Sequence, residues 1–256
     1  MDQNTPEQWF KSLPILTRIG LSVFLSATVL VAVGIIGGPV QQPALLILNW
    51  PLALRKMQVW RLITTVCYLG PFGMHFLFEC YFFTTFSGKL ENNEIFRQPG
   101  EYLFFLLCQI LMLDVVSLVL RYPDGVPLLG HSLVFAIIYY WSRREPYAEL
   151  SFFMFKVKGY QLPFAIMLFN ILMGGGIWME LLGLATGHLW YFLKEVVPAE
   201  YGRILIKTPT FFNTFMAGQL GQSHAAAQAA APRGGGAAPA PAPNRFGGAG
   251  HRLGGN

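Results

Sequence analysis

The chain has 256 residues, of which 54% are hydrophobic and only 12% are charged, and its mean hydropathy is +0.45. This composition excludes an ordinary soluble domain, in which about a quarter of the residues carry a charge. The net charge of +5 comes from basic residues scattered along the chain, so it does not indicate a nucleic-acid partner. We therefore expect a membrane protein that contacts lipids and no nucleic acid.

Six apolar segments are candidate membrane spans in an all-α membrane domain over residues 1–200. A bilayer core of about 30 Å needs roughly 20 helical residues. The candidates are Ile15–Ile36, Phe72–Phe86, Tyr102–Leu120, Pro127–Trp141, Leu162–Met173 and Ile177–Phe192. The first is too long for the apolar core of a signal peptide, so we expect it to stay as a span. Gly174, Gly175 and Gly176 separate the last two, because consecutive glycines do not sustain a helix.

Two features of this domain bear on how it meets the bilayer. The segment Gly37–Leu69 is half apolar but is interrupted by prolines, and it carries Trp50, Trp60 and Tyr68. We predict that it lies in the membrane interface, where amphipathic aromatic rings prefer to sit. Several spans hold only about 12 to 16 apolar residues. Short spans of this kind predict local thinning of the bilayer.

The basic residues predict the orientation of the six spans. Of the 18 Lys and Arg residues, four (Arg55, Lys56, Arg61 and Arg121) lie in loops on one side, and the remaining 14 lie on the other. Cytosolic loops carry the excess of Lys and Arg. We therefore expect both termini in the cytosol.

Polar residues inside the spans are candidates for function, because such residues normally face a bundle interior or a wet cavity. They are Glu79, Asp114, His131, Ser132, Asn170, Glu180 and His188. Asp114, Asn170, Glu180 and His188 are our candidates for lining a polar crevice. Pairing of Asp114 and Glu180 with polar neighbours is the alternative, and the residues do not decide between the two.

Two motifs resemble the rhomboid superfamily of intramembrane proteases: Trp60-Arg61 and the pair Gly183 and Gly187. Active rhomboids carry Gly-x-Ser-Gly on span four and a His three residues before the first Gly of the pair. Here Leu133 replaces the last Gly after Ser132, and Glu180 stands at the His position. His188 is eight residues further on, about 12 Å along a helix, whereas a nucleophile and its base must approach to about 3 Å. We therefore expect no catalytic residue.

The wider pattern is similar to the Derlin family, an inactive branch of the rhomboids. The matching motifs are Trp60-Arg61-Leu62-Ile63-Thr64, Trp141-Ser142-Arg143-Arg144, the glycine pair followed by His188 and Tyr191-Phe192, and Arg252-Leu253-Gly254. This resemblance implies a rhomboid-like six-helix bundle in the endoplasmic-reticulum (ER) membrane. It also implies a non-catalytic role in ER-associated degradation, with misfolded clients and an ER ubiquitin-ligase complex as partners. No cofactor or metal is expected.

The end of the chain predicts a flexible binding arm. After a juxtamembrane segment over residues 201–222, residues 223–256 are mostly Ala, Pro, Gly and Gln, a composition typical of disorder. Phe246 and Leu253 close this tail as two apolar anchors across a Gly-rich spacer, which indicates a linear motif that pairs with a sheet edge. The pattern resembles the box by which Derlins recruit the AAA ATPase valosin-containing protein. That resemblance assigns ATPase binding to Phe246, Gly248, Gly250, Arg252 and Leu253.

Several alternatives stay open. Gly183 and Gly187 suit a close-packing face between helices, the usual use of small residues four apart in membranes. For Arg61 we favour a structural staple in the interfacial segment over direct substrate contact. An active rhomboid-type serine protease with Ser132 as nucleophile is one alternative function. A small-solute transporter is another, although we see no internal repeat of the kind that transporters carry.

Overall fold

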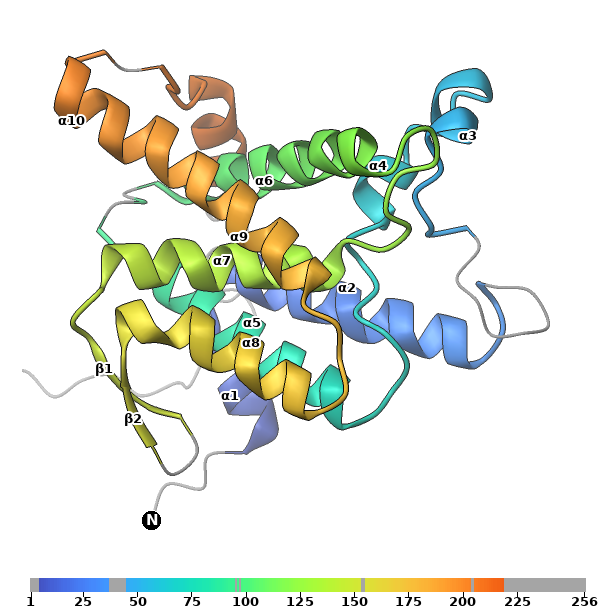
Figure 1. Ribbon diagram of the computed structural model, residues 1–256, viewed down its shortest axis with the longest axis horizontal. Coiled ribbons are helices and arrows are strands. Elements are labelled where there is room, and N and C mark those ends of the chain that lie inside the picture. The colour runs from blue at the N-terminus through green and yellow to red at the C-terminus, as the bar shows by residue number, and fades with distance from the viewer. Residues whose placement is uncertain are drawn as a thin grey trace, which may run out of the picture. The chain divides into compact units, whose positions relative to one another are not determined.

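The computed structural model describes residues 5–36, 45–94, 96, 98–152, 155–203 and 205–218 (Figure 1). Residues up to 218 belong to one compact unit, and residues 219–256 lie outside the described residues. The elements are α1 (Pro6–Ser12), α2 (Ile15–Ala32), α3 (Trp50–Arg55), α4 (Arg61–Thr64), α5 (Met74–Glu91), α6 (Pro99–Leu120), α7 (Gly130–Arg144), β1 (Glu149–Phe152), β2 (Phe155–Lys158), the 3-10 helix η1 (Gly159–Gln161), α8 (Leu162–Leu172), α9 (Trp178–Tyr191), the π-helix η2 (Phe192–Val196) and α10 (Val197–Tyr201). Residues 210–218 are also helical.

The predicted all-α bundle is confirmed, because helices dominate the described residues and six of them, α2 and α5 to α9, stand at the predicted span positions. By length and hydropathy, two of the described helices, Ile15–Ala32 and Gly100–Leu120, could cross a membrane, and Gly159–Leu172 is a shorter apolar helix. Large apolar side chains are exposed on these helices, among them Ile19, Val29, Leu111, Val119, Phe164 and Leu168. So much exposed apolar surface is typical of a protein surrounded by lipid.

The ends of several helices differ from the apolar segments. Helix α2 ends at Ala32, four residues early, before a turn in which Gly34 has a φ of 81°. Helix α5 runs on to Glu91, and the helix that begins with α9 continues through η2 and α10 to Tyr201. Counting apolar residues misses such extensions, because a helix goes on as a polar, solvated helix once it leaves the apolar layer.

The helices at the predicted span positions differ in length, and the prediction of short spans stays a prediction. Helix α5 has 18 residues, the last of them beyond the predicted apolar segment Phe72–Phe86. Helix α8 has only 11 residues, and together with η1 the helix Gly159–Leu172 is about 22 Å long, still below the roughly 30 Å of a hydrocarbon core. Helix α7, with 15 residues, is about 22 Å long. Shortness is thus concentrated in α7 and α8.

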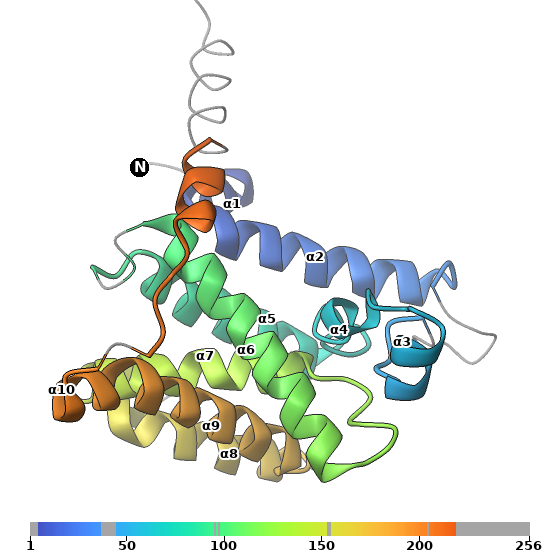
Figure 2. The same cartoon turned by 90° about the horizontal axis from the view of Figure 1, so that it is seen from above.

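Helix α7 forms the centre of the bundle. Every residue from Ser132 to Ser142 is buried, and α7 packs against α9, α5, α8 and α6. In Figure 2, seen at right angles to the first view, α5 and α9 lie on different sides of α7. Aromatic side chains fill the core beside it: the rings of Phe105 and Tyr140 have centroids 5.1 Å apart, and those of Phe105 and Trp190 are 5.3 Å apart. The residues of α7 are therefore held by neighbours on every side.

One end of the bundle is fastened by the last residue of α5. The first amides of a helix have no partner within it, and here the carboxylate of Glu91 accepts from the backbone N–H groups of Leu16 and Thr17 at 2.8 Å each. A negative charge at this position also suits the helix dipole. The hydroxyl of Ser87 is 2.8 Å from that of Thr17 and 2.6 Å from that of Tyr102. The start of α2, the end of α5 and the start of α6 therefore meet.

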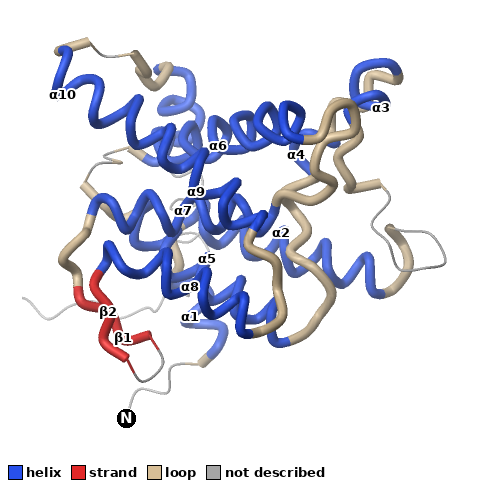
Figure 3. Tube along the Cα trace, viewed as in Figure 1, coloured by secondary structure: helices blue, strands red, loops and turns tan. Residues whose placement is uncertain are grey.

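The loop between α7 and α8 contains a β-hairpin that the all-α prediction missed. Strands β1 and β2 pair antiparallel, with Glu149 opposite Lys158 and Leu150 opposite Val157 (Figure 3). Each strand has only four residues, and so short an alternation of polar and apolar residues is a weak sequence signal.

Candidate functional site

The Arg61 side chain is buried inside the segment of residues 45–69, which precedes α5, and hydrogen-bonds to other parts of it. Only 6% of its surface is exposed. Its Nε donates to Oε1 of Gln58 at 2.7 Å, and its Nη1 donates to the Ile47 carbonyl oxygen at 2.7 Å. A planar guanidinium can serve several acceptors at once, so it joins chain segments that are 14 residues apart. Trp60, the neighbouring residue, is half exposed at the start of α4.

The same segment is fixed to the loop that leads into α7. The backbone N–H of Leu48 and the hydroxyl of Thr65 both donate to the Pro127 carbonyl oxygen, at 2.9 and 3.1 Å. The backbone N–H of Leu129 donates in return to the Thr65 carbonyl oxygen at 3.0 Å. A Cβ on Gly130 would lie only 2.6 Å from the Tyr68 carbonyl oxygen. Residues 45–69 therefore support the N-terminal end of α7, where His131 and Ser132 lie.

Gly183 and Gly187 face α7 across its contact with α9. A Cβ on Gly183 would overlap the carbonyl oxygen of Ser132, and a Cβ on Gly187 would lie 3.0 Å from the carbonyl oxygen of Ala136. Both glycines are buried. The two backbones can approach this closely because neither position carries a side chain.

The hydroxyl of Ser132 is buried and committed to a hydrogen bond. It donates to the Met179 carbonyl oxygen at 2.8 Å. His188 lies elsewhere: its Nδ1 is 2.7 Å from the hydroxyl of Tyr139, seven residues further along α7, or about 10 Å of helix. The described geometry therefore pairs Ser132 with a carbonyl oxygen and His188 with a tyrosine.

Polar side chains gather in a cavity at the end of α7 where His131 and Ser132 lie. The cavity has a volume of about 460 Å³ and lies between α5, α7, α8 and α9. Its polar lining includes His75, His131, Asn170 and Glu180. A smaller hollow, which shares these four residues, also reaches Glu79. The amide nitrogen of Asn170 donates to Glu180 Oε1 and, at 3.4 Å, to the Gly176 carbonyl oxygen.

The structure brings together only part of the predicted polar crevice. Asn170 and Glu180 line the cavity, whereas Asp114 and His188 line neither hollow, so grouping all four in one crevice was wrong. Asp114 is buried in α6, and His188 is exposed on α9. Residues on one helix point in directions set by a 100° turn per residue, and the sequence does not say which helix each face meets.

His75 of this cavity was not predicted from the sequence, whereas Glu79, which reaches the smaller hollow, was among the candidates for function. His75 and Glu79 are four residues apart in α5, so they lie on the same face of that helix. This spacing was the available signal for His75. The predicted ATPase-binding residues Phe246, Gly248, Gly250, Arg252 and Leu253 lie outside the described residues.

Comparison of the sequence with known proteins shows the family of this chain. Residues 13–210 match the Der1-like family. The chain is 34% identical over 217 residues to a probable derlin-2 homolog of Dictyostelium discoideum, covering 83% of this chain and 84% of the relative. It is 32% identical over 219 residues to Derlin-2.2 of Arabidopsis thaliana (82% of this chain, 88% of the relative), and 30% identical over 215 residues to Derlin-1 of the same plant (84% and 78%). With its exposed apolar helices, the chain is a membrane protein and belongs to the Der1-like family.

Proposed function

We propose that this protein is a non-catalytic component of ER-associated degradation that assists the retrotranslocation of misfolded proteins to the cytosol. The observation that carries the proposal is the state of Ser132, whose hydroxyl donates to the Met179 carbonyl oxygen. The next residue of α9 is Glu180, a carboxylate that is itself bonded to Asn170. A serine without a positioned base is a weak nucleophile. A Der1-like membrane bundle with such a site is suited to handling polypeptides without cleaving them.

The membrane domain, residues 1–200, would lower the free-energy cost of moving a polar chain across the bilayer. Helix α8 with η1, about 22 Å long, would leave part of a normal bilayer core unmatched, and the lipid around it would thin. The polar cavity of about 460 Å³ lies beside the same helix. A client segment that enters there would cross a shorter apolar layer.

The charges support an orientation with both termini in the cytosol. Lys89, Arg143 and Arg144 lie in the last turns of α5 and α7, and Lys194 lies in η2, which follows α9. Basic residues concentrate on the cytosolic side of membrane proteins. The tail, which follows η2 and α10, would then extend into the cytosol.

The tail would recruit the AAA ATPase valosin-containing protein, and the membrane body would meet an ER ubiquitin-ligase complex, misfolded clients and lipids. Phe246 and Leu253 would supply the apolar anchors of the tail. Gly248 and Gly250 would let its backbone approach the ATPase without a Cβ. A flexible arm holds its partner at a high local concentration without new contacts to the membrane body.

The test is the turnover of a misfolded ER client in cells that lack their own derlins. We expect the full chain to restore turnover and the double variant Phe246→Ala/Leu253→Ala to restore little while it still resides in the ER. Pro239→Ala/Pro241→Ala, in the spacer of the same tail, is the matched control and should behave like the unchanged chain. Failure of the unchanged, expressed chain to restore turnover would refute the proposal.

The tail is tested separately with peptides of residues 244–256 and the N-terminal domain of the ATPase. The unchanged peptide should bind, and the double Ala peptide should lose at least about tenfold in affinity, since the two apolar anchors are its main buried groups. Equal affinities would remove the ATPase from the proposal and leave the role of the membrane body standing.

A further inference from the structure

Two histidines and a glutamate from α5 and α7 converge at the edge of the cavity. His75 and Glu79 lie one turn apart on α5, and His131 is the second residue of α7. Glu79 Oε1 is 3.4 Å from Nδ1 of His131 and 4.0 Å from Nε2 of His75. The three potential ligand atoms all lie within 4.8 Å of one another. The imidazole rings of His75 and His131 have centroids 4.7 Å apart.

Several polar atoms of this group are buried without a hydrogen bond. Glu79 Oε2, Glu180 Oε2 and His131 Nδ1 are shielded from solvent, and none has a hydrogen-bonding partner among the described residues. Glu180 is more than nine-tenths buried and lines the same two hollows as His75 and His131. Buried polar atoms are normally paired, because leaving them unpaired is costly. A cation bound between them would satisfy the carboxylate oxygens and the imidazole nitrogens together.

The donor set selects the class of cation. Imidazole nitrogen combined with carboxylate oxygen suits Zn²⁺ and related transition-metal ions, whereas Mg²⁺ and Ca²⁺ prefer oxygen ligands alone. Ligands about 2.0 Å from a tetrahedral ion lie roughly 3.3 Å from one another. The observed 3.4 Å between His131 and Glu79 fits this spacing, whereas the three ligand atoms spread over up to 4.8 Å, so the side chain of His75 would move toward the other two on binding.

We propose that His75, Glu79 and His131 bind a divalent transition-metal ion of the Zn²⁺ class, which would link α5 to the start of α7. Three protein ligands leave a fourth position that faces the cavity, and water or Glu180 Oε2 would take it. The hydrogen bond that Asn170 donates to Glu180 Oε1 would orient the Glu180 carboxylate, leaving Oε2 for the ion. The ion would reach the site through the cavity, at whose rim the side chain of His75 is half exposed. This site is independent of the function proposed above.

The test uses the full chain in lipid nanodiscs, with its purification tag removed and its metals stripped by a chelator. Zn²⁺ is then added, and bound metal is measured by equilibrium dialysis with elemental analysis. We compare the unchanged chain with His75→Gln, Glu79→Gln and His131→Gln. His188→Gln is the matched control, since it removes a histidine of the same bundle that pairs with Tyr139 instead. The comparison between variants also cancels any binding by histidines in the tail.

We expect one more bound ion per chain in the unchanged protein and in His188→Gln than in each of the three ligand variants. Loss of a ligand should weaken binding at least about tenfold. Co²⁺ should give visible absorption bands of tetrahedral nitrogen and oxygen ligation that are absent from the His75→Gln variant. Because His75 is half exposed, that variant should fold, and its thermal unfolding checks this. Equal metal content in the unchanged chain and in a folded His75→Gln variant would overturn the proposed site. Loss of the bound ion in the control variant His188→Gln would overturn it as well.

Discussion

Gly183 of α9 lies directly against the main chain of Ser132 in α7, so that a methyl group on Gly183 would overlap the Ser132 carbonyl oxygen. One turn further on, Gly187 faces the main chain of Ala136 with slightly more room. Of these two contacts between the helices, the tighter one is beside Ser132. Side chains added there would separate α9 from the central helix of the bundle.

Alanine at these glycines should destabilise the protein in a graded way. Gly183→Ala should lower the free energy of unfolding by about 1–3 kcal/mol, because neither backbone can move aside easily. Gly187→Ala, whose Cβ would sit 3.0 Å from the Ala136 carbonyl oxygen, should cost less. Gly176→Ala is the control, since a Cβ there has no neighbour within 4 Å among the described residues. Thermal unfolding in detergent measures all three, and equal midpoints would contradict close packing.

Ser132→Ala should leave client turnover unchanged. The hydroxyl donates to the Met179 carbonyl oxygen and makes a longer contact, 3.9 Å, with the Met179 sulfur, so its removal should cost about 0.5–1.5 kcal/mol of stability. The unchanged chain should also fail to react with a fluorophosphonate, which labels activated serines. The measurement is a chase of a misfolded ER client at matched expression. Slower turnover at normal abundance, or labelling that Ser132→Ala abolishes, would restore the protease as the better explanation.

The sequence predicted the bundle better than the site, and the reason is physical. A membrane span is a long apolar run, and this run is visible in one segment alone, as in Pro99–Leu120. The rotation of each helix is set by packing between segments that are far apart in the chain. His75 and His131 meet although 56 positions separate them, whereas Asp114 does not line the same cavity. No local pattern records such a meeting.

Arg61 shows what the sequence can predict about one residue. Its position beside Trp60 suggested a structural staple. In the structure its hydrogen bonds to Gln58 and to the Ile47 carbonyl oxygen join separate parts of the segment, as a staple would. The identity of those acceptors was beyond prediction, because Ile47 lies 14 residues away along an irregular segment. The hairpin of β1 and β2 was missed for a related reason: strands of four residues gain their stability from pairing rather than from local propensity.

Arg61→Lys should loosen the segment before α5, although it keeps the charge. An ammonium cannot match the planar fork that serves both acceptors, so we expect a loss of about 1–3 kcal/mol and faster proteolysis within residues 45–60. Arg55→Lys is the matched control, because Arg55 is exposed in the last turn of α3. Limited proteolysis in nanodiscs, followed by mass spectrometry, reads out the segment. Equal cleavage of the two variants would reduce Arg61 to an interface anchor.

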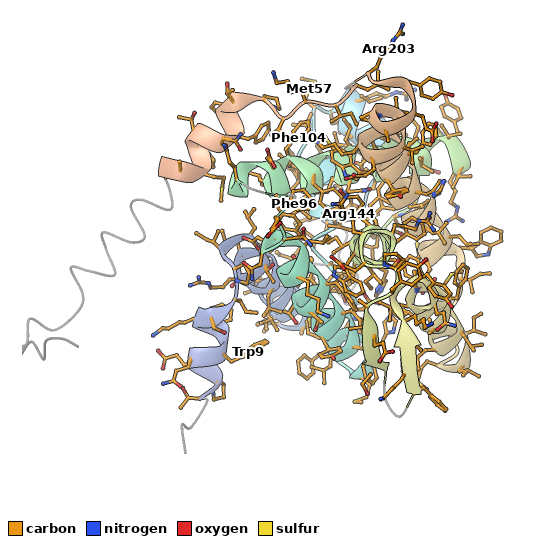
Figure 4. The ribbon with its side chains drawn as sticks, turned by 90° about the vertical axis from the view of Figure 1, so that its left-hand side faces the viewer. Trp9, Met57, Phe96, Phe104, Arg144 and Arg203 are labelled. Carbon is orange, nitrogen blue, oxygen red and sulfur yellow. The ribbon has the colours of Figure 1, made fainter. Side chains whose placement is uncertain are left out.

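Arg144 and Glu195 tie the end of α7 to the π-helix that follows α9. Arg144 Nη1 lies 2.6 Å from Glu195 Oε2, and the hydroxyl of Tyr140 donates to Oε1 of the same carboxylate at 2.9 Å. Figure 4 looks onto this end of the bundle, where Arg144 lies near the middle and Arg203 and Trp9 lie further out. Because the two side chains are only 28% and 24% exposed, water screens the pair less than it would at the surface.

A double-mutant cycle of Arg144→Met and Glu195→Gln should therefore give a coupling free energy of about 1–2 kcal/mol. The same cycle on Lys11 and Glu7 is the matched control, because that pair has the same 2.6 Å separation but side chains that are 68% and 74% exposed. We expect no measurable coupling there, since solvent screens an exposed pair and both side chains lose freedom when they meet. Unfolding at low and high salt separates the cases further: the Arg144 pair should keep most of its coupling free energy in 0.5 M salt, where the Debye length is only about 4 Å. Equal coupling free energies in the two pairs would show that burial adds nothing to the Arg144–Glu195 interaction. The pair would then contribute no more than a surface ion pair to fixing η2 against α7.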